Sequence, residues 1–414
     1  MAPLGSRHVC SVLVIDDSAV QRQHAAALCR GLGVATVHEA AGGSEALALL
    51  AQLPEPPDLL LLDLEMPGMD GVELLHQMQR HGMARPVVVV SQREQALIDL
   101  VVSMARTMAL DAPAGLHKPL DAQALRQAFE QLGRRSAVGT AESRAPEPAQ
   151  LRNAIAQGQI SVHYQPKVDV RTGFVRGVEA LARWLPPGQP AIAPDCFVPL
   201  AEREGLIQPL TRAVMEQAFA QTATWGARGL HLPVAVNLSA QLLEDPGLVD
   251  EIRTLAARHA LAPAQVVLEL TESELVSFRG AAFGVLARLR LQGFGLSLDD
   301  YGTGFSSMQQ LARIPFTELK IDRAFVHGAS HKRRLQVMLH SALDMAQRLE
   351  LPTVAEGVET LADWRLLQQL GCTAGQGWLI ARPMPAQELP TWLTTHRQRR
   401  RELLPEPLSA SYHP

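Results

Sequence analysis

Acidic residues follow two short apolar runs near the start of the chain. Asp16 and Asp17 come after VLVI, Asp63 after LLLL, Ser91 after VVVV, and Lys118 stands in HKP. Three neighbouring carboxylates repel one another, and a Mg²⁺ ion held by oxygen ligands relieves that repulsion. A carboxylate can also act as a nucleophile and form an aspartyl phosphate, whose oxygens a hydroxyl and an ammonium would contact. Dipeptides such as Asp16-Asp17 and Lys118-Pro119 are by themselves common in turns, but the whole set of residues predicts a phosphoryl-accepting site.

A second set of polar residues closes apolar runs later in the chain. The set is Glu179, Asn237, Glu269, Asp299, Asp300, Lys320, Glu356 and Gln376. Oxygen ligands favour Mg²⁺ or Mn²⁺, and no His/Cys set indicates zinc. So many ligand groups suggest a two-metal centre, which stabilises both the attacking and the leaving oxygen of a phosphoryl displacement. A single strand-end acid can simply cap a helix, but caps do not explain the whole set.

The elements that must position the first set alternate between strand and helix. Strand-like runs at 9–15, 35–38, 59–62 and 87–90 are separated by helical patterns at 19–30, 44–52, 71–81 and 95–108. This alternation predicts a parallel sheet covered on both faces, with ligands bound outside the carboxyl ends of the strands. We therefore predict an α/β, doubly wound, flavodoxin-like domain over residues 1–132.

The second set requires a larger α/β domain. Candidate strands lie at 161–165, 175–179, 234–237, 266–269, 296–299, 318–321, 353–356 and 373–376. Eight strand–helix units are typical of a (β/α)₈ barrel, whose active site lies at the C-terminal ends of its strands. We predict this barrel over residues 151–395, after a linker at 133–150 that is rich in Gly, Ser, Pro and charged residues. A polar tail is expected at 396–414.

Composition excludes several functional classes. The 414 residues carry 38 Lys+Arg against 42 Asp+Glu, a net charge of −4, and such a chain is a poor nucleic-acid binder. The sequence has no apolar run near the ~18 residues of a membrane helix and no secretion signal. Its four cysteines are scattered, which is typical of reduced thiols. These features predict a cytoplasmic protein that binds neither DNA nor membrane.

The motifs VLVIDDS, LLLLDLEMPGMDG, VVVVS and HKP resemble the receiver domain of two-component response regulators. The resemblance implies that Asp63 accepts a phosphoryl group from a sensor histidine kinase or phosphotransfer protein. It further implies that Asp16 and Asp17 hold one Mg²⁺ ion, while Ser91 and Lys118 contact the phosphate.

One stretch departs from the receiver pattern. Gly115 and Leu116 stand where many receivers carry a Tyr or Phe that swings inward. The sequence therefore does not predict the usual aromatic switch, and coupling to the output domain would run through another surface.

The later motifs resemble the EAL-domain family, which hydrolyses cyclic di-GMP to linear 5′-pGpG. The signature is Glu179-Ala180-Leu181, followed by Arg183, and the motifs VNLS, LELTES, SLDDYGTG, LKID, AEGVE and GQGW come in order. The resemblance implies two metal-ligand sets: Glu179, Asn237, Glu269 and Asp299 for one ion, and Asp299, Asp300 and Glu356 for the other. It also implies that Lys320 assists the attacking water, that Gln376 positions it, and that Arg183 and Leu181 contact the substrate.

The segment DDYGTGFSSM is similar to the family loop that joins the active site to a dimer interface. This likeness implies a homo-oligomer, dimer or tetramer, in which Gly302 and Thr303 couple the loop and Glu272 braces it. Glu272 could instead cap the helix expected at 274–278.

Two functions remain open at this point. One is a cyclic di-GMP phosphodiesterase whose activity phosphorylation of Asp63 modulates. The other is a non-catalytic barrel that binds cyclic di-GMP or a protein partner. A binding-only barrel would be expected to have lost one or more metal-binding residues, and none is missing, so the complete set favours the enzyme. A DNA-binding regulator is not expected, because the barrel occupies the output position.

Overall fold

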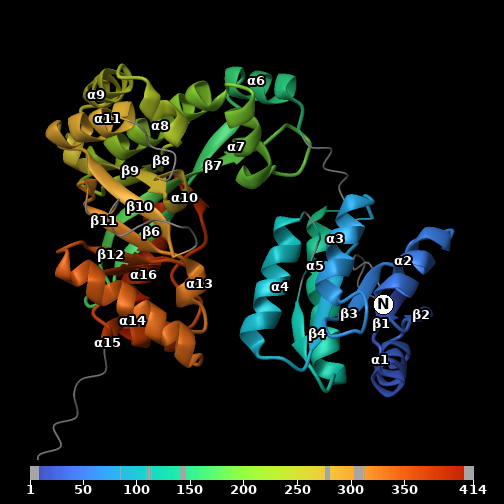
Figure 1. The fold of residues 1–414 in the computed structure, drawn as a ribbon. Coiled ribbons are helices and arrows are strands. Elements are labelled where there is room, and N and C mark those ends of the chain that lie inside the picture. Colours follow the sequence, from blue (N-terminus) through green and yellow to red (C-terminus); the bar gives the residue numbers. More distant parts are fainter. Residues whose placement is uncertain are drawn as a thin grey trace, which may run out of the picture. The chain divides into compact units, whose positions relative to one another are not determined.

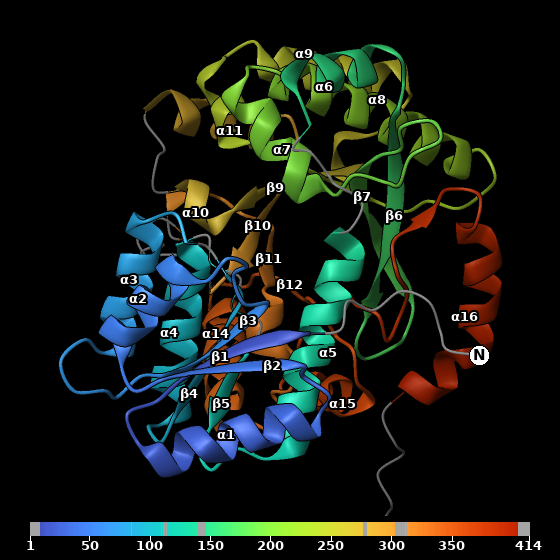
Figure 2. The same cartoon turned by 90° about the vertical axis from the view of Figure 1, so that its right-hand side faces the viewer.

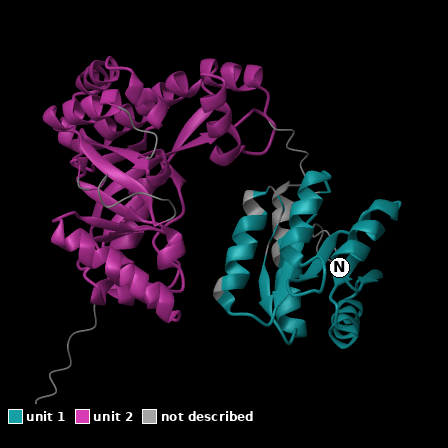
Figure 3. Ribbon diagram, viewed as in Figure 1, with its two compact units in different colours: residues 1–144 teal, residues 145–414 magenta. Residues whose placement is uncertain are grey.

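The computed structural model describes residues 9–139, 146–275, 280–302 and 311–404, apart from positions 84, 109, 111, 113 and 312. The chain forms two compact units, residues 1–144 and 145–414 (Figure 3). Each unit buries its own apolar residues, so each has the core that holds its candidate site in place.

The first unit is built on a parallel sheet in the order β2-β1-β3-β4-β5. Its strands are β1 (Ser11–Ile15), β2 (Thr36–Ala40), β3 (Leu59–Asp63), β4 (Val87–Ser91) and β5 (Gly115–His117). This order is the flavodoxin-like one, so the predicted doubly wound fold is confirmed. The expected strands did not include β5, which is only three residues long and contains a glycine.

Alternating side chains of each strand enter two separate cores. The helices of this unit are α1 (Ala19–Gly31), α2 (Gly43–Gln52), α3 (Gly71–Arg80), α4 (Gln95–Thr107) and α5 (Ala122–Gly139). On β1, Val12 and Val14 pack with residues of α1 and α5, whereas Leu13 and Ile15 pack with residues of α2, α3 and α4. Successive strand side chains point to opposite faces, so helices cover both faces of the sheet (Figures 1 and 2).

The second unit is a closed barrel with helices around it (Figure 1). Its strands are β6 (Ile160–Asp169), β7 (Val175–Trp184), β8 (Val234–Asn237), β9 (Val266–Thr271), β10 (Gly295–Tyr301), β11 (Glu318–Ile321), β12 (Thr353–Ala355) and β13 (Ala374–Gly375). Pairing of β13 with β6 closes the barrel, and β14 (Met384–Pro385) adds to the other part of β6. The predicted eight-stranded barrel is confirmed.

The first barrel strand differs from the expected parallel arrangement. β6 runs antiparallel to both β7 and β13. Only residues 170–174 connect β6 to β7, and a parallel connection needs about a dozen residues or more. Asp169 accepts hydrogen bonds from the amides of Arg171 and Thr172, which stabilises this tight hairpin. The strand is also longer than expected, because it pairs with β7 along most of its length.

Helices follow most barrel strands. They are α6 (Pro148–Ala156), α7 (Pro194–Arg203), α8 (Ile207–Gly226), α9 (Leu248–Arg258), α10 (Glu272–Leu275), α11 (Gly280–Leu291), α13 (Arg323–Val326), α14 (Arg333–Arg348), α15 (Leu361–Gln369) and α16 (Leu389–Leu403), with 3₁₀ turns η1 (Ala240–Glu244) and η2 (Pro263–Gln265). Within the residues that the structure describes, none of the helices has the length and apolar character needed to cross a membrane.

The segments expected to be linker and tail carry some regular structure. α5 extends into the segment at 133–150, and α6 begins inside it; residues 140–145 lie outside the described part. The first residues of the expected polar tail, from 396, belong to α16. His396 is buried and bonds to the Gly173 carbonyl, and Trp364 donates to the Leu403 carbonyl. These contacts fasten the end of α16 to the barrel.

Candidate functional site

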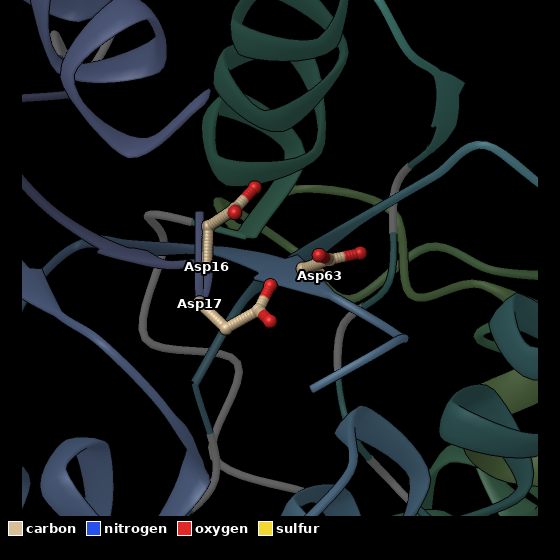
Figure 4. A group of neighbouring side chains, drawn as sticks. All are labelled: Asp16, Asp17 and Asp63. Carbon is tan, nitrogen blue, oxygen red and sulfur yellow. The ribbon is translucent and has the colours of Figure 1, made fainter. Parts of the chain in front are cut away.

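The first candidate site lies at the carboxyl ends of β1 and β3. One carboxylate oxygen from each of Asp16, Asp17 and Asp63 lies within 4.8 Å of the others (Figure 4). Lys118 Nζ donates to Asp16 Oδ2 and to Asp63 Oδ2, at 2.7 Å each. Ser91 is buried at the end of β4, and its carbonyl accepts the Lys118 amide. The structure thus brings all five predicted residues to one edge of the sheet.

Burial governs the electrostatics of this first site. It raises the pKa of Asp63, although the hydrogen bond and charge of Lys118 oppose the rise. Burial alone would lower the pKa of Lys118, but its bonds to Asp16 and Asp63 outweigh burial and raise that pKa. The ammonium therefore offsets part of the carboxylate charge. The oxygens of Asp16, Asp17 and Asp63 are close enough together to fit a hard cation such as Mg²⁺. Asp17 is exposed, so solvent reaches this group of oxygens.

The position without an aromatic residue is filled by helix α4. A Cβ atom built on Gly115 would lie 2.2 Å from Ile98 Cγ2 and 3.1 Å from Val102 Cγ2. Ile98 is fully buried. The α4 side chains therefore occupy the space into which an aromatic side chain from β5 would have to swing.

Introducing an aromatic ring at this position is expected to destabilise the first unit. Gly115→Tyr would force Ile98 and Val102 apart, and overpacking of this kind typically costs about 1–3 kcal/mol. The measurement is thermal unfolding followed by circular dichroism. Gly31→Ala is the control, because a Cβ atom there has no neighbour within 4 Å. Equal melting temperatures for Gly115→Tyr and wild type would contradict the close α4–β5 packing.

The second candidate site gathers around one buried lysine at the barrel rim. Lys320 Nζ lies 2.6 Å from Glu356 Oε1, 2.9 Å from Asp299 Oδ2, 3.0 Å from Glu269 Oε2 and 3.4 Å from Glu179 Oε2. These residues come from β7, β9, β10, β11 and the residue after β12. The barrel therefore converges side chains that are far apart in the sequence.

The Lys320 ammonium does not by itself balance the carboxylates of this rim. Burial and the charge of Glu269 raise the pKa of Glu179 to about 7. Burial also raises the pKa of Glu356 well above its usual range, and burial together with the charge of Asp299 raises the pKa of Asp300 to about 6. These carboxyl groups gain from additional positive charge in the site.

The rim carboxylates form two overlapping triads. Oxygens of Glu179, Glu269 and Asp299 lie within 4.8 Å of one another, and so do oxygens of Asp299, Asp300 and Glu356. Asp299 belongs to both triads. All donors are oxygens, which fits Mg²⁺ or Mn²⁺.

Asn237 completes the first triad from the end of β8. Its Nδ2 donates to Glu179 Oε1 at 3.1 Å, so the amide nitrogen faces the triad. A metal-binding role for Asn237 requires the amide to turn its oxygen to the ion.

Gln376 follows β13 and carries an amide oxygen that points to a further ligand. Its Nε2 donates to Glu179 Oε2 at 2.6 Å and to Gln165 Oε1 at 2.9 Å. Its Oε1 is buried and has no hydrogen-bond partner in the part of the chain that the structure describes. A buried polar atom without a partner is costly, so this oxygen is suited to accept a hydrogen bond from a bound water.

Gln165 is a site residue that the sequence analysis missed. It lies on β6, donates from Nε2 to the Ala381 carbonyl, and thereby orients Gln376. The predicted strand at 161–165 ended at Gln165, but the set of strand-end polar residues did not include it; in the structure it lies in the middle of the longer, antiparallel β6 and faces the rim. Its place directly opposite Glu179 in the β6–β7 hairpin is the signal that could have revealed it.

Two hollows open beside the triads. One of about 610 Å³ is lined in part by Asn237 and Asp195, and another of about 260 Å³ by Gln376 and Trp378. Glu179, Leu181 and Asp299 line both. Leu181 therefore lies at the boundary between the two hollows, next to the carboxylates of Glu179 and Asp299.

Arg183 lies further along β7 than the signature residues. Its Nη1 donates to the carbonyl of Ala182, and burial lowers its pKa. Among the described lining residues of the two hollows, Arg183 is not included.

A hydrogen bond joins Glu272 to the loop after β10. Glu272 Oε2 accepts a hydrogen bond from the Gly302 amide at 2.6 Å. Of the two roles expected for Glu272, contact with the loop or capping of a helix, the structure contains the contact with the loop. Gly302 has φ +109°, and a Cβ atom there would lie 2.4 Å from the Phe325 ring. Thr303 lies outside the described residues, as does most of the helix expected at 274–278.

Comparison with known proteins identifies both units. Residues 149–383 match the EAL domain, and residues 12–130 match the response regulator receiver domain. The chain therefore belongs to the EAL-domain family and carries a receiver domain, so the resemblance to a receiver–EAL response regulator is confirmed.

Two relatives of this chain, RocR and MucR, come from Pseudomonas aeruginosa. The chain is 31% identical to the cyclic di-GMP phosphodiesterase RocR over 382 residues, which cover 91% of this chain and 97% of RocR. It is 42% identical to the bifunctional diguanylate cyclase/phosphodiesterase MucR over 241 residues, 58% of this chain but only 35% of MucR. A solved structure of the MucR phosphodiesterase with cyclic di-GMP superposes with a TM-score of 0.56 at 42% identity, covering 58% of this chain and 98% of that one.

Proposed function

We propose that this protein hydrolyses cyclic di-GMP to linear 5′-pGpG with two divalent cations, and that phosphorylation of Asp63 modulates the reaction. The observation that carries the proposal is the pair of carboxylate triads sharing Asp299 around Lys320, at the rim of an EAL barrel. Support for the substrate comes from RocR, which is similar along nearly its whole length, and from the MucR barrel solved with cyclic di-GMP.

The residues at the rim have separate tasks in the proposed reaction. Glu179, Asn237, Glu269 and Asp299 would hold one Mg²⁺ or Mn²⁺ ion, and Asp299, Asp300 and Glu356 would hold the other. Such ions supply Lewis-acid polarisation of the phosphodiester and a nucleophilic water at neutral pH. Gln376 Oε1 would orient the attacking water by accepting a hydrogen bond from it. Lys320 remains protonated and stabilises the negative charge that develops on the phosphoryl oxygens.

The two hollows are suited to a substrate with two nucleotide halves. Together they extend from Asp195 to Trp378 and meet at Leu181 beside the carboxylates. A scissile phosphodiester at Leu181 would place one nucleotide in each hollow. Leu181 would pack against the substrate, and Arg183 would contact a phosphate after its guanidinium turns.

The receiver unit is proposed to supply the regulation. A sensor histidine kinase or phosphotransfer protein would transfer a phosphoryl group to Asp63, with one Mg²⁺ ion at Asp16 and Asp17. We further propose a homo-oligomer, dimer or tetramer, in which the loop that begins at Gly302 couples subunits. A conformational shift of the receiver would then change the population of the active loop.

Metal removal tests the proposed reaction directly. The purified chain is incubated with cyclic di-GMP and Mg²⁺, with and without excess EDTA, and the products are separated by chromatography. We expect 5′-pGpG to form with Mg²⁺ and turnover to stop in EDTA. Intact substrate in both samples, together with tight binding of cyclic di-GMP, would instead support a non-catalytic receptor and contradict the hydrolase.

A further inference from the structure

A second buried lysine lies inside the barrel, close to the rim site. Lys167 is on β6, and its side chain is 6% exposed. Its Nζ donates to Glu269 Oε1 and to Glu318 Oε1, at 2.7 Å each. Ser297 Oγ donates to the same oxygen of Glu318 at 3.0 Å. Lys167, Glu318 and Ser297 thus form a polar cluster in which Lys167 and Ser297 are buried and Glu318 is half-buried; we call it the inner cluster.

Each residue of the inner cluster lies two positions along its strand from a residue of the rim. Lys167 is two residues from Gln165, Glu318 is two residues from Lys320, and Ser297 is two residues from Asp299. Strand residues two apart point to the same face, so the inner cluster forms a layer adjoining the rim residues. The residue opposite Lys167 on β7 is Gly177, so no side chain from that position competes with the lysine.

The two lysines hold different oxygens of Glu269. Lys167 binds Oε1, whereas Lys320 binds Oε2 at 3.0 Å and also contacts Glu179 and Asp299. The Glu269 side chain is fully buried. Rotation of this carboxylate would break the short bond to Lys167, so Oε2 stays on the side of the triad.

We propose that Lys167 is a positioning residue for the barrel metal site: by holding Oε1 of Glu269 from the inner layer, it presents Oε2 to a divalent cation. This inference rests on the proposed metal-dependent function. Lys167 touches neither cation nor substrate. It acts through Glu269, as groups that hydrogen-bond to metal ligands commonly do.

Metal affinity tests this role without depending on turnover. Mn²⁺ binding is measured by titration calorimetry on the full chain, with Asp17→Asn in every variant to weaken the receiver site. Lys167→Met is expected to weaken Mn²⁺ binding at the barrel by roughly 10- to 100-fold. Ser297→Ala is the matched control: it removes the hydrogen bond from Ser297 Oγ to Glu318 in the inner cluster and leaves both bonds of Lys167 in place, so the affinity should change by less than about twofold.

A double substitution separates positioning from a general loss of structure. In a Glu269→Gln background, Lys167→Met should change Mn²⁺ affinity by less than about twofold, because the carboxylate that it orients is already gone. If Lys167→Met does not fold, Lys167→Met with Glu318→Met removes the unpaired carboxylate as well. The same loss of affinity is expected for that pair.

The outcomes distinguish this inference from the proposed function. Two results would overturn the positioning role alone. In one, Lys167→Met binds Mn²⁺ at the barrel with the affinity of its parent protein. In the other, Lys167→Met lowers the affinity equally in proteins with Glu269 and with Glu269→Gln. Failure of the Asp17→Asn parent protein to bind Mn²⁺ at the barrel would overturn the metal-dependent function on which the role rests.

Discussion

Glu179→Gln is expected to reduce turnover of cyclic di-GMP by more than about 100-fold. Loss of a residue that only hydrogen-bonds to a metal ligand typically lowers activity by about 10- to 100-fold, and loss of a ligand itself should lower it further. Glutamine keeps the size of the side chain and can still bond to Asn237, but it lacks the charge. Gln376 would then face an amide in place of the carboxylate oxygen to which it now donates at 2.6 Å. The substitution therefore removes a metal ligand and disturbs the residue proposed to position water. Product formation is measured with saturating Mg²⁺.

Arg176→Gln provides the control for this result. Arg176 lies on the same strand, is exposed, and pairs with Asp169 at 3.2 Å, outside the rim. It should retain wild-type turnover, since exposed ion pairs contribute about 0–1 kcal/mol. Equal turnover in Glu179→Gln and Arg176→Gln would exclude Glu179 as a metal ligand.

Asp63→Asn is expected to abolish phosphoryl incorporation while basal hydrolysis of cyclic di-GMP persists. The carboxamide cannot act as the nucleophile that forms an aspartyl phosphate. The site otherwise keeps its shape, because the Asn oxygen can still accept the bond from Lys118. Incorporation is measured with radiolabelled acetyl phosphate and Mg²⁺, and turnover is measured on the same preparation.

Asp70→Asn is the matched control in the same unit. Asp70 caps α3 through the Glu73 amide, and Asn caps helices about as well as Asp. This variant should be labelled like wild type. Labelling of Asp63→Asn would show that another residue accepts the phosphoryl group, and loss of its basal turnover would show that Asp63 does more than accept phosphate.

Sequence reasoning located most of the candidate site because parallel β/α units have a regular geometry. Each strand that precedes a helix presents its last residues to the same edge of the sheet or the same rim of the barrel. Glu269, Asp299 and Lys320 are found in this way from their order in the chain alone. The receiver residues Asp16 and Asp63 follow the same rule, as the short distances between their carboxylates show.

Contacts that depend on barrel closure were decided only by the tertiary structure. The antiparallel direction of β6 places Gln165 beside Gln376, 211 residues later, and Lys167 beside Glu269, 102 residues later. In the structure both residues lie in the middle of β6, and although the predicted strand at 161–165 ended at Gln165, its position in the sequence did not indicate a contact with residues so much later in the chain. The filling of the space beside Gly115 by α4 is likewise a packing result.

The chain by itself thus determined the two fold classes, the acidic strand ends and the oxygen-rich chemistry of both sites. These features follow from the local hydrophobic periodicity and the residue types, and both can be read from a short stretch of sequence without knowing the rest of the molecule. Only the tertiary structure decided which oxygen each lysine holds and which carboxylates share Asp299. Such pairings require side chains from opposite walls of the barrel to meet, and their positions are fixed by the closed strand register.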